Sequence, residues 1–231
     1  MKRSLVIPCL DEARSLPGLI ERCASLDDGR TEVLLVDNGS TDRTPQVLGE
    51  LLPTRPHMRS IRVEVNQGYG KGILEGLAAT RGDLLGWTHA DLQTDPLDAA
   101  RGFALFDAAP DPERLLVKGS RRGRPMGDQV FTIGMAIFES ALLGARLWDI
   151  NAQPTLFHRS LFESFRDPPW DFALDLYVYA EARQKGLRVE RFPVLFGPRA
   201  HGRSHWNIDW RAKARFIRRT LGYSVALRRR R

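Results

Sequence analysis

The stretch Val33-Leu34-Leu35-Val36-Asp37-Asn38-Gly39-Ser40 decides how this sequence folds. Its first four residues are all aliphatic, which is typical of a strand buried on both faces of a parallel sheet. Turn-forming polar residues follow at once and end the strand. Thr44-Pro45 then predicts the start of a helix that continues to about Leu52. The stretch therefore has the pattern of one strand–helix unit of an α/β protein.

The same alternation recurs on both sides of this stretch. In the first half of the chain we expect further strands at residues 5–7, 61–65 and 84–88, and helices at residues 17–25, 71–80 and 96–106. In the less regular second half we expect strands at 115–118, 155–157 and 188–192, a loop at 119–127, helices at 130–145 and 172–184, and a helical tail from residue 207. Repeated strand–helix units predict an α/β fold with a mostly parallel sheet and helices on both faces.

The charge of the chain is unevenly distributed. The chain has 35 Lys and Arg against 28 Asp and Glu, which is a formal net charge of +7. Residues 201–231 hold ten of the basic residues and one acidic residue, so the other 200 residues carry 25 basic and 27 acidic residues. The larger part of the chain is therefore nearly neutral. This distribution argues against a protein that coats nucleic acid, and we expect no nucleic-acid partner.

Four polar clusters follow predicted strands: Asp11-Glu12, Asp37-Asn38-Gly39-Ser40, Asn66-Gln67-Gly68 and His89-Ala90-Asp91. Each cluster alone has the composition of a turn or a helix cap. In open α/β sheets, however, ligands bind outside the carboxyl ends of the strands, so the four together predict one ligand site. An imidazole and a carboxylate placed like His89 and Asp91 can hold Mg²⁺ or Mn²⁺, which in turn neutralises a diphosphate.

The order of these motifs resembles that of family 2 glycosyltransferases of the GT-A fold. The segments that carry the resemblance are Val6–Glu12, Val36–Asp42, Asn66–Gly72 and Ala90–Gln93. Within that family, Val117–Arg121 and Pro198–Ser204 are similar to the polyprenyl-phosphate sugar synthases, the branch of dolichol-phosphate mannose synthase. The resemblance covers nearly the whole chain. It implies a GT-A fold, a nucleotide-diphosphate sugar of the UDP-glucose or GDP-mannose type as donor, and a divalent metal ion, Mg²⁺ or Mn²⁺.

The resemblance also implies roles for individual residues. Asp91 matches the last Asp of the family's DxD metal motif, whereas His89 stands where the family has the first Asp and suggests an altered metal preference. Arg121 matches the basic residue that meets the donor diphosphate or the acceptor phosphate, and Arg199 matches part of the element that closes over the diphosphate. The residues implied to bind the nucleotide sugar are Pro8, Leu10, Glu12, Asp37, Gly68, Lys71, Ala90, Asp91, Gln93, Arg121, Arg199 and Ser204.

The acceptor depends on whether the site offers a general base. A hydroxyl acceptor needs one, whereas an acceptor phosphate is already an anionic nucleophile. Asp171 and Asp175 fall in the region where many family members hold an acceptor-side acid, and we expect them on one face of the predicted helix at 172–184. Asp175 is therefore a candidate base, although an Asp in a first turn also complements the helix dipole.

The arginines of Arg121-Arg122-Gly123-Arg124 favour a phosphate-bearing acceptor. We therefore expect inverting transfer of a hexose to a polyprenyl phosphate, with Asp91, Asp175 and Arg121 as the candidate catalytic residues. One alternative is transfer to a hydroxyl of a cell-wall or other glycan, with Asp175 as the base. The other is a non-catalytic protein that binds nucleotide sugars, in which His89 marks a metal site that has been lost.

The tail has the pattern of an amphipathic helix. Apolar residues recur in it at helical spacing, beside a flank of arginines; they are Trp206, Trp210, Ile217, Leu221 and Val225. We expect a catalytic domain over residues 1–205 and a basic helix over residues 206–231 that either packs on that domain or lies on an anionic membrane. No stretch approaches 18 apolar residues, so we expect a cytoplasmic protein or one peripheral to the inner face of the cell membrane.

Overall fold

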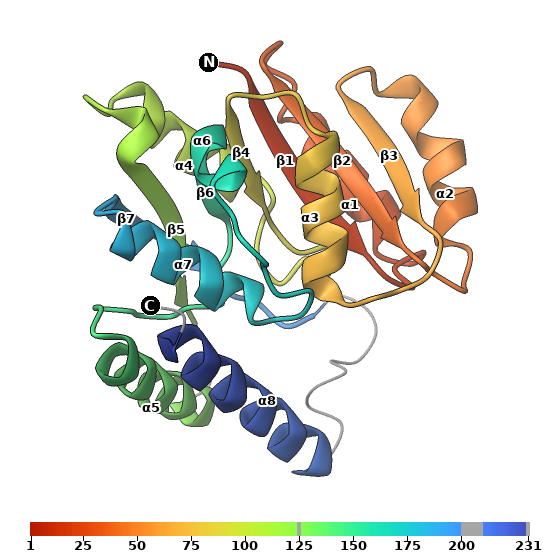
Figure 1. Cartoon of the computed structure of the whole chain (residues 1–231). Coiled ribbons are helices and arrows are strands. Elements are labelled where there is room, and N and C mark those ends of the chain that lie inside the picture. Colours follow the sequence, from red (N-terminus) through yellow and green to blue (C-terminus); the bar gives the residue numbers. More distant parts are fainter. Residues whose placement is uncertain (124–125, 200–209, 230–231) are drawn as a thin grey trace.

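A seven-stranded sheet with the strand order β3-β2-β1-β4-β6-β5-β7 forms the centre of the protein (Figure 1). The computed structural model describes residues 1–123, 126–199 and 210–229, without the side chains of Asp128, Phe131 and residues 210–217. β6 runs antiparallel to its neighbours β4 and β5, and the other neighbouring strands are parallel to one another. The predicted, mostly parallel α/β sheet is thereby confirmed.

The strands are β1 (Arg3–Cys9), β2 (Thr31–Asn38), β3 (Met58–Val63), β4 (Leu84–Trp87), β5 (Leu115–Arg122), β6 (Thr155–His158) and β7 (Arg188–Leu195). The helices are α1 (Leu16–Ala24), α2 (Thr44–Leu51), α3 (Tyr69–Ala79), α4 (Asp98–Asp107), α5 (Met126–Leu143), α6 (Arg159–Glu163), α7 (Leu174–Gln184) and α8 (Trp210–Arg229). Short 3-10 helices occupy Leu52–Thr54 and Pro112–Arg114.

The loop predicted at residues 119–127 is wrong in its first part. β5 continues to Arg122 and pairs with β7 along its whole length, with Arg122 opposite Leu195. A glycine and two adjacent arginines disfavour a strand by local preference, but the ladder with β7 outweighs that preference. As a result, Arg121 lies in a strand that ends at the site edge of the sheet, and its backbone position is set by the sheet.

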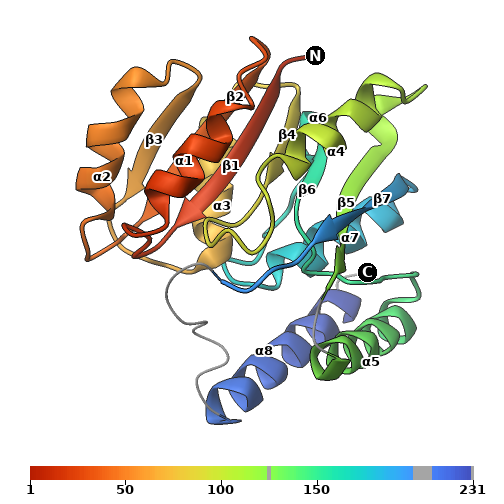
Figure 2. The same cartoon turned by 180° about the vertical axis from the view of Figure 1, so that it is seen from behind.

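The central strands are buried on both faces, as their aliphatic runs predict. Leu34 and Val36 of β2 belong to a core that α3, α6 and α7 cover, whereas Val33 and Leu35 belong to a second core covered by α1, α2 and α4. Figures 1 and 2 show these two helical layers from opposite sides. Successive side chains of a strand point to opposite faces, so one aliphatic run serves both cores.

α5 and α8 lie side by side beyond the edge at which the parallel strands end (Figures 1 and 2). Ser224 of α8 donates a hydrogen bond of 2.6 Å to Oε1 of the buried Glu139 of α5, and Leu227 of α8 is also buried. The basic tail therefore packs against α5. None of the helices in the described part of the chain is both long and apolar enough to cross a bilayer.

Candidate functional site

The site lies where the order of the parallel strands reverses. β2 and β3 extend the sheet on one side of β1, and β4 lies on the other side. Asp11 and Glu12 follow β1, and His89 and Asp91 follow β4, so residues about 80 positions apart meet at one edge. Such a reversal leaves a crevice in which α/β proteins bind ligands.

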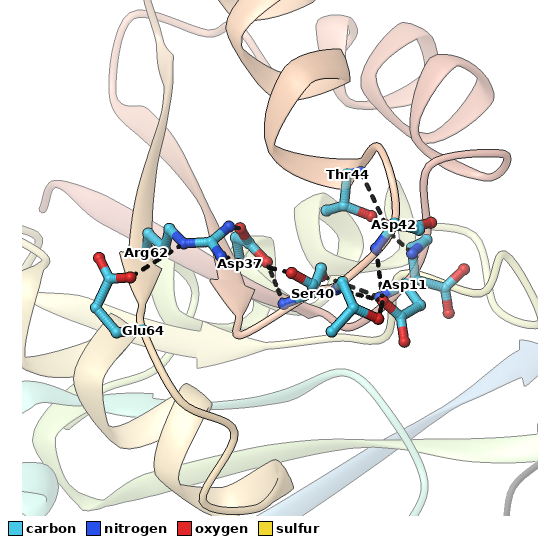
Figure 3. A network of polar contacts seen from close by, with 9 residues as sticks. Asp11, Asp37, Ser40, Asp42, Thr44, Arg62 and Glu64 are labelled. Atoms are coloured by element: carbon cyan, nitrogen blue, oxygen red, sulfur yellow. Dashed lines mark hydrogen bonds and ion pairs between the residues drawn. The ribbon is translucent and has the colours of Figure 1, made fainter.

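Asp11 ties the loop after β1 to the loop after β2 (Figure 3). Its Oδ1 accepts hydrogen bonds from the backbone N–H groups of Thr41 and Asp42, at 2.8 and 3.2 Å. Its own N–H donates to Ser40 Oγ at 3.0 Å. Asp11 has a φ of 54°, a left-handed conformation that costs a non-glycine residue free energy unless such bonds fix it. This network gives the loops at this edge of the sheet a defined shape.

Asp37 is buried at the end of β2 with both carboxylate oxygens engaged. Oδ1 accepts from the N–H of Ser40 at 2.9 Å, and Oδ2 forms an ion pair with Arg62 of β3 (Figure 3). Arg62 also reaches Glu64 at 3.5 Å. Asp37 therefore sits at the predicted edge of the site, and the bonds that it makes shape the loop in which a base or ribose is expected.

Pro8 near the end of β1, and Leu10 and Glu12 just after it, are half-buried. The Glu12 side chain accepts a hydrogen bond from Ser15 at 2.7 Å. Burial raises the pKa of the Glu12 carboxyl, while the bond to Ser15 and the charge of Arg199 act against this rise. Because Arg199 and Asp91 both act on Glu12, this residue links the end of β1 to the cluster around Asp91.

Asp91 is the centre of a small polar cluster and is only 4% exposed. Its Oδ1 accepts from the N–H of Gln93 at 3.1 Å, and its Oδ2 accepts from Arg199 at 2.8 Å. Gln93 also fixes the segment that carries Arg199, since Gln93 and Gly197 exchange two hydrogen bonds, of 2.8 and 3.2 Å. The structure thus brings three of the predicted donor-site residues together; Ser204 lies outside the described residues.

Ala90 lies between His89 and Asp91 in the loop after β4. Its side chain is buried in the core that α1 and α4 cover. A methyl group in this position packs against the protein, and Ala90 can offer a ligand only its backbone.

His89 faces the other half of the site. Its Nε2 lies 3.3 Å from the hydroxyl of Tyr69, whose ring stacks on Phe172 at a centroid distance of 4.6 Å. Within the described residues, no group of three or more His, Cys, Asp or Glu side chains is arranged to hold a metal ion. One buried carboxylate with an imidazole nearby fits a Mg²⁺ or Mn²⁺ site in which donor phosphates and water supply most of the oxygens.

Gly68 and Lys71 contact the segment that precedes α7. A Cβ on Gly68 would lie 2.3 Å from the carbonyl oxygen of Trp170, and the N–H of Lys71 donates to the same oxygen at 3.0 Å. The Lys71 ammonium bonds to Glu75 at 2.6 Å and lies 4.7 Å from the centre of the Trp170 ring. The close backbone approach that the glycine permits is therefore made by the protein's own chain.

Arg121 is paired with Asp149, a residue that belongs to none of the sequence motifs. The guanidinium forms two bonds to Asp149 Oδ1, and the backbone N–H of Arg121 donates to Oδ2 at 2.9 Å. Burial alone would raise the pKa of the Asp149 carboxyl, but the charge and hydrogen bonds of Arg121 outweigh it and hold that pKa below its usual range. Arg121 thus lies near the end of β5, and its charge is paired with that of Asp149.

Asp175 is only 1% exposed, in the first turn of α7. Its Oδ1 accepts from Gln153 Nε2 at 2.7 Å and lies 3.8 Å from the ammonium of Lys118. Burial raises the pKa of the Asp175 carboxyl, although Lys118 and His89 oppose the rise. The electrostatic link to His89 connects Asp175 to the cluster around Tyr69.

The expectation that Asp171 and Asp175 share a helix face is wrong. α7 begins at Leu174, so Asp171 precedes it. Its Oδ1 accepts from the N–H of Ala173 at 2.8 Å, and its Oδ2 pairs with Arg219 of α8 at 2.7 Å. Asp171 therefore joins the start of α7 to the basic tail, and of the two residues only Asp175 lies in α7.

Comparisons with known proteins agree with this geometry. The family model described as glycosyl transferase family 2 matches residues 4–165. Glucosyl-3-phosphoglycerate synthase from Mycobacterium tuberculosis, in complex with Mn²⁺, UDP and glucosyl-3-phosphoglycerate, is similar with a TM-score of 0.74 and 21% identity, over 98% of this chain and 79% of that chain. The complex of the same enzyme with Mn²⁺, UDP-glucose and phosphoglyceric acid has a TM-score of 0.75 and 20% identity, over 98% of this chain and 79% of that chain. A mycobacterial protein has a TM-score of 0.74 and 23% identity, over 98% of this chain and 74% of that chain. These likenesses confirm the GT-A fold.

Proposed function

The chain belongs to glycosyl transferase family 2, and we propose that it transfers a hexose from a nucleotide-diphosphate sugar to polyprenyl phosphate at an anionic membrane surface. The donor would be of the UDP-glucose or GDP-mannose type. Two sets of residues support the proposal: the polar cluster at the ends of β1, β2 and β4, and an apolar surface on α5 beside the basic α8.

The donor diphosphate would bind next to Asp91 and Arg199. Departure of the nucleoside diphosphate leaves negative charge on its phosphates, and cations placed there beforehand stabilise that charge. Asp91, with His89 near it, would hold Mg²⁺ or Mn²⁺, and the ion would neutralise part of the charge. Arg199 supplies a cation from the chain itself; its Nε is buried and has no hydrogen-bond partner among the described residues, and a phosphate oxygen that reached it would satisfy this N–H.

The observation that carries the membrane part of the proposal is a row of exposed apolar side chains on α5. Five of its large apolar residues are between 38% and 81% exposed; they are Met126, Val130, Ile133, Ile137 and Phe138. The first four recur at intervals of four, three and four residues, which places them along one face of the helix. An exposed apolar stripe of this kind fits the acyl region just below lipid headgroups.

Charge on the neighbouring helix favours an anionic membrane as the partner. α8 contains seven basic residues and no acidic residue. Arg218, Arg228 and Arg229 are exposed there, and each basic residue near an anionic surface contributes about 1 kcal/mol to membrane binding. The apolar stripe and the arginines together offer the two forms of attraction that peripheral membrane helices use.

The test supplies purified protein with Mn²⁺, labelled UDP-glucose or GDP-mannose, and polyprenyl phosphate in anionic vesicles. We expect the labelled hexose to enter the organic-solvent fraction, and Asp91→Ala to abolish the transfer. An Asp91→Ala protein with full activity would overturn the assignment of the site. Binding of the nucleotide sugar without transfer to any acceptor would instead support the non-catalytic alternative.

A hydroxyl acceptor is the second candidate, and the surroundings of Asp175 favour it. A carboxyl with a raised pKa is a stronger general base than an ordinary Asp, and Asp175 has this property. In addition, Asp149 offsets the charge of Arg121, so Arg121 attracts an acceptor phosphate less than its position predicts. A pocket adjoins the start of α7; Arg121, Glu139 and Phe172 are among its lining residues. A parallel assay with free glycan acceptors distinguishes the two candidates.

A further inference from the structure

Lys118 is a fully buried lysine in the middle of β5. Its side chain is 0% exposed, and it stands between Val117 and Gly119 in a strand whose other central residues are apolar. Lysine is almost never fully buried unless its charge is paired. The sequence pattern predicts an apolar residue at this position, so the charge of Lys118 has to be compensated by groups around it.

The ammonium of Lys118 lies between two oxygen atoms. It donates a hydrogen bond of 2.5 Å to Thr155 Oγ1 of β6, and it lies 3.8 Å from Asp175 Oδ1 of α7. The centre of the Tyr179 ring is 5.9 Å away. The same Oδ1 of Asp175 also accepts a hydrogen bond from Gln153. A hydrogen-bond donor and a cation from separate segments therefore converge on one oxygen of a single carboxylate.

Four charged groups act on Lys118 from the elements packed around it. Asp175 of α7 and Asp149, which precedes β6, favour its charged form, while Arg191 of β7 and Arg121 of β5 disfavour it. Burial lowers the pKa of the Lys118 ammonium to about 8, with Asp175 the strongest opposing influence. The lysine is thus mainly coupled to Asp175, since Asp149 is already paired with Arg121.

We infer that Lys118 is a positioning residue that, together with Gln153, holds Asp175 ionised and in a fixed orientation on the acceptor side of the site. Without a cation beside it, a carboxyl as deeply buried as Asp175 would favour its neutral form, which accepts a proton poorly. The hydrogen bond from Gln153 to Oδ1 restricts the rotation of the carboxylate about its last bond, and the Lys118 ammonium, 3.8 Å from the same oxygen, favours its charged form. The consequence for catalysis rests on the second proposed function, in which Asp175 is the base. The electrostatic coupling between Lys118 and Asp175 does not depend on that function.

The test compares Lys118→Met with Lys118→Gln. The first variant removes the charge and keeps the volume, and the second keeps a polar group within reach of Thr155 but has no charge. Lys185→Met serves as the control, because Lys185 is an exposed lysine beyond the end of α7. The readouts are the titration of the Asp175 carboxyl by ¹³C NMR, assigned with Asp175→Asn, and the pH profile of kcat/KM.

Both Lys118 variants should raise the pH at which Asp175 titrates by about one unit or more, because a neighbouring cation lowers a carboxyl pKa by about one to three units. The acid limb of kcat/KM should move in the same direction, and kcat should fall while the KM for the donor changes little. Lys185→Met should leave all four quantities unchanged. An unaltered Asp175 titration in the folded Lys118→Gln protein would overturn the inference.

The proposed function can fail separately. If Asp175→Asn keeps full activity with a hydroxyl acceptor, Asp175 is not the base. The NMR titration of Asp175 in the wild type and in the Lys118 variants still decides whether Lys118 controls its ionisation. If Lys118→Met does not fold, the titration in Lys118→Gln decides, with thermal unfolding used to show that this variant is native. If neither variant folds, the role of Lys118 is structural and the inference is refuted.

Discussion

Arg199 Nη2 donates a hydrogen bond of 2.8 Å to Asp91 Oδ2, so the carboxylate expected to hold a metal ion is paired with a cation of the chain itself. The two residues are 108 positions apart. A divalent ion at Asp91 has to compete with this guanidinium. If the ion displaces Arg199 from Asp91, the freed guanidinium lies beside the place where the diphosphate would bind. The pair therefore couples metal binding to the position of Arg199.

Arg199→Gln should bind Mn²⁺ more tightly than the wild type when no nucleotide is present, by about tenfold, which corresponds to about 1.4 kcal/mol. The same change should weaken binding of the nucleotide sugar, because one charge-assisted hydrogen bond to the diphosphate is lost. Titration of free Mn²⁺ by electron paramagnetic resonance measures the first effect, and calorimetry with the donor measures the second. Arg81→Gln, at an exposed position, is the control and should alter neither. Unchanged Mn²⁺ affinity in Arg199→Gln would show that the ion pair does not compete with the metal.

The pairing of Arg121 with Asp149 should make the free energy of unfolding depend on pH in the acidic range. The folded-state pKa of Asp149 lies below its unfolded value, so its contribution is complete above about pH 4, the ordinary value for Asp, and is lost as the pH falls through the folded value. Asp149→Asn should lower the free energy of unfolding at pH 7 by about 3 kcal/mol, because it leaves a buried arginine without its partner.

The difference between the wild type and Asp149→Asn should shrink as the pH falls below about 4. Urea unfolding at several pH values measures this difference. Asp83→Asn, which changes an exposed carboxylate, provides the comparison. If Asp149→Asn were as stable as the wild type at pH 7, the ion pair would not contribute to stability.

Membrane binding should depend on the apolar stripe of α5. Val130→Asp combined with Ile137→Asp places two charges on it, and the burial of each apolar side chain in lipid is worth about 1.5–3 kcal/mol. Co-sedimentation with anionic vesicles at low salt should therefore be lost, while the thermal unfolding temperature stays close to that of the wild type. Val65→Asp, at a 67% exposed apolar residue beyond the end of β3, should still sediment. Equal sedimentation of all three proteins would exclude the stripe as the docking surface.

Two glycine substitutions separate a required glycine from a dispensable one. Gly68→Ala should destabilise the protein by about 1–3 kcal/mol, because Gly68 has a φ of 122° and its added Cβ would lie 2.3 Å from a backbone oxygen. Gly49→Ala in α2 should stabilise it by about 0.5–1 kcal/mol, since nothing lies within 4 Å of the added atom. Chemical denaturation of both variants tests this, and a neutral Gly68→Ala would contradict the packing of segment 169–171 on α3.

The surroundings of Asp175 were only partly predictable from the sequence. Asp175 stands out in the sequence because it lies in the first turn of a predicted helix, where the family resemblance implies an acceptor-side acid. Its partner Lys118 lies in an otherwise apolar run, and no motif points to it. Gln153 is equally inconspicuous. The signal that was available is the lysine itself, since a charged residue in the centre of a buried strand requires a partner. Which partner it meets depends on how β5, β6 and α7 pack.

The amino-acid sequence alone determined the strand–helix alternation, the buried central strands and the edge of the sheet at which the polar clusters collect. These features depend on aliphatic runs and turn residues that are close together in the chain, so local preference and hydrophobic periodicity reveal them. Only the tertiary structure decided which charges meet: Arg199 with Asp91, Arg121 with Asp149, and Lys118 with Asp175. These partners are between 28 and 108 residues apart, and ion pairs at such separations exist only after the sheet and helices have packed.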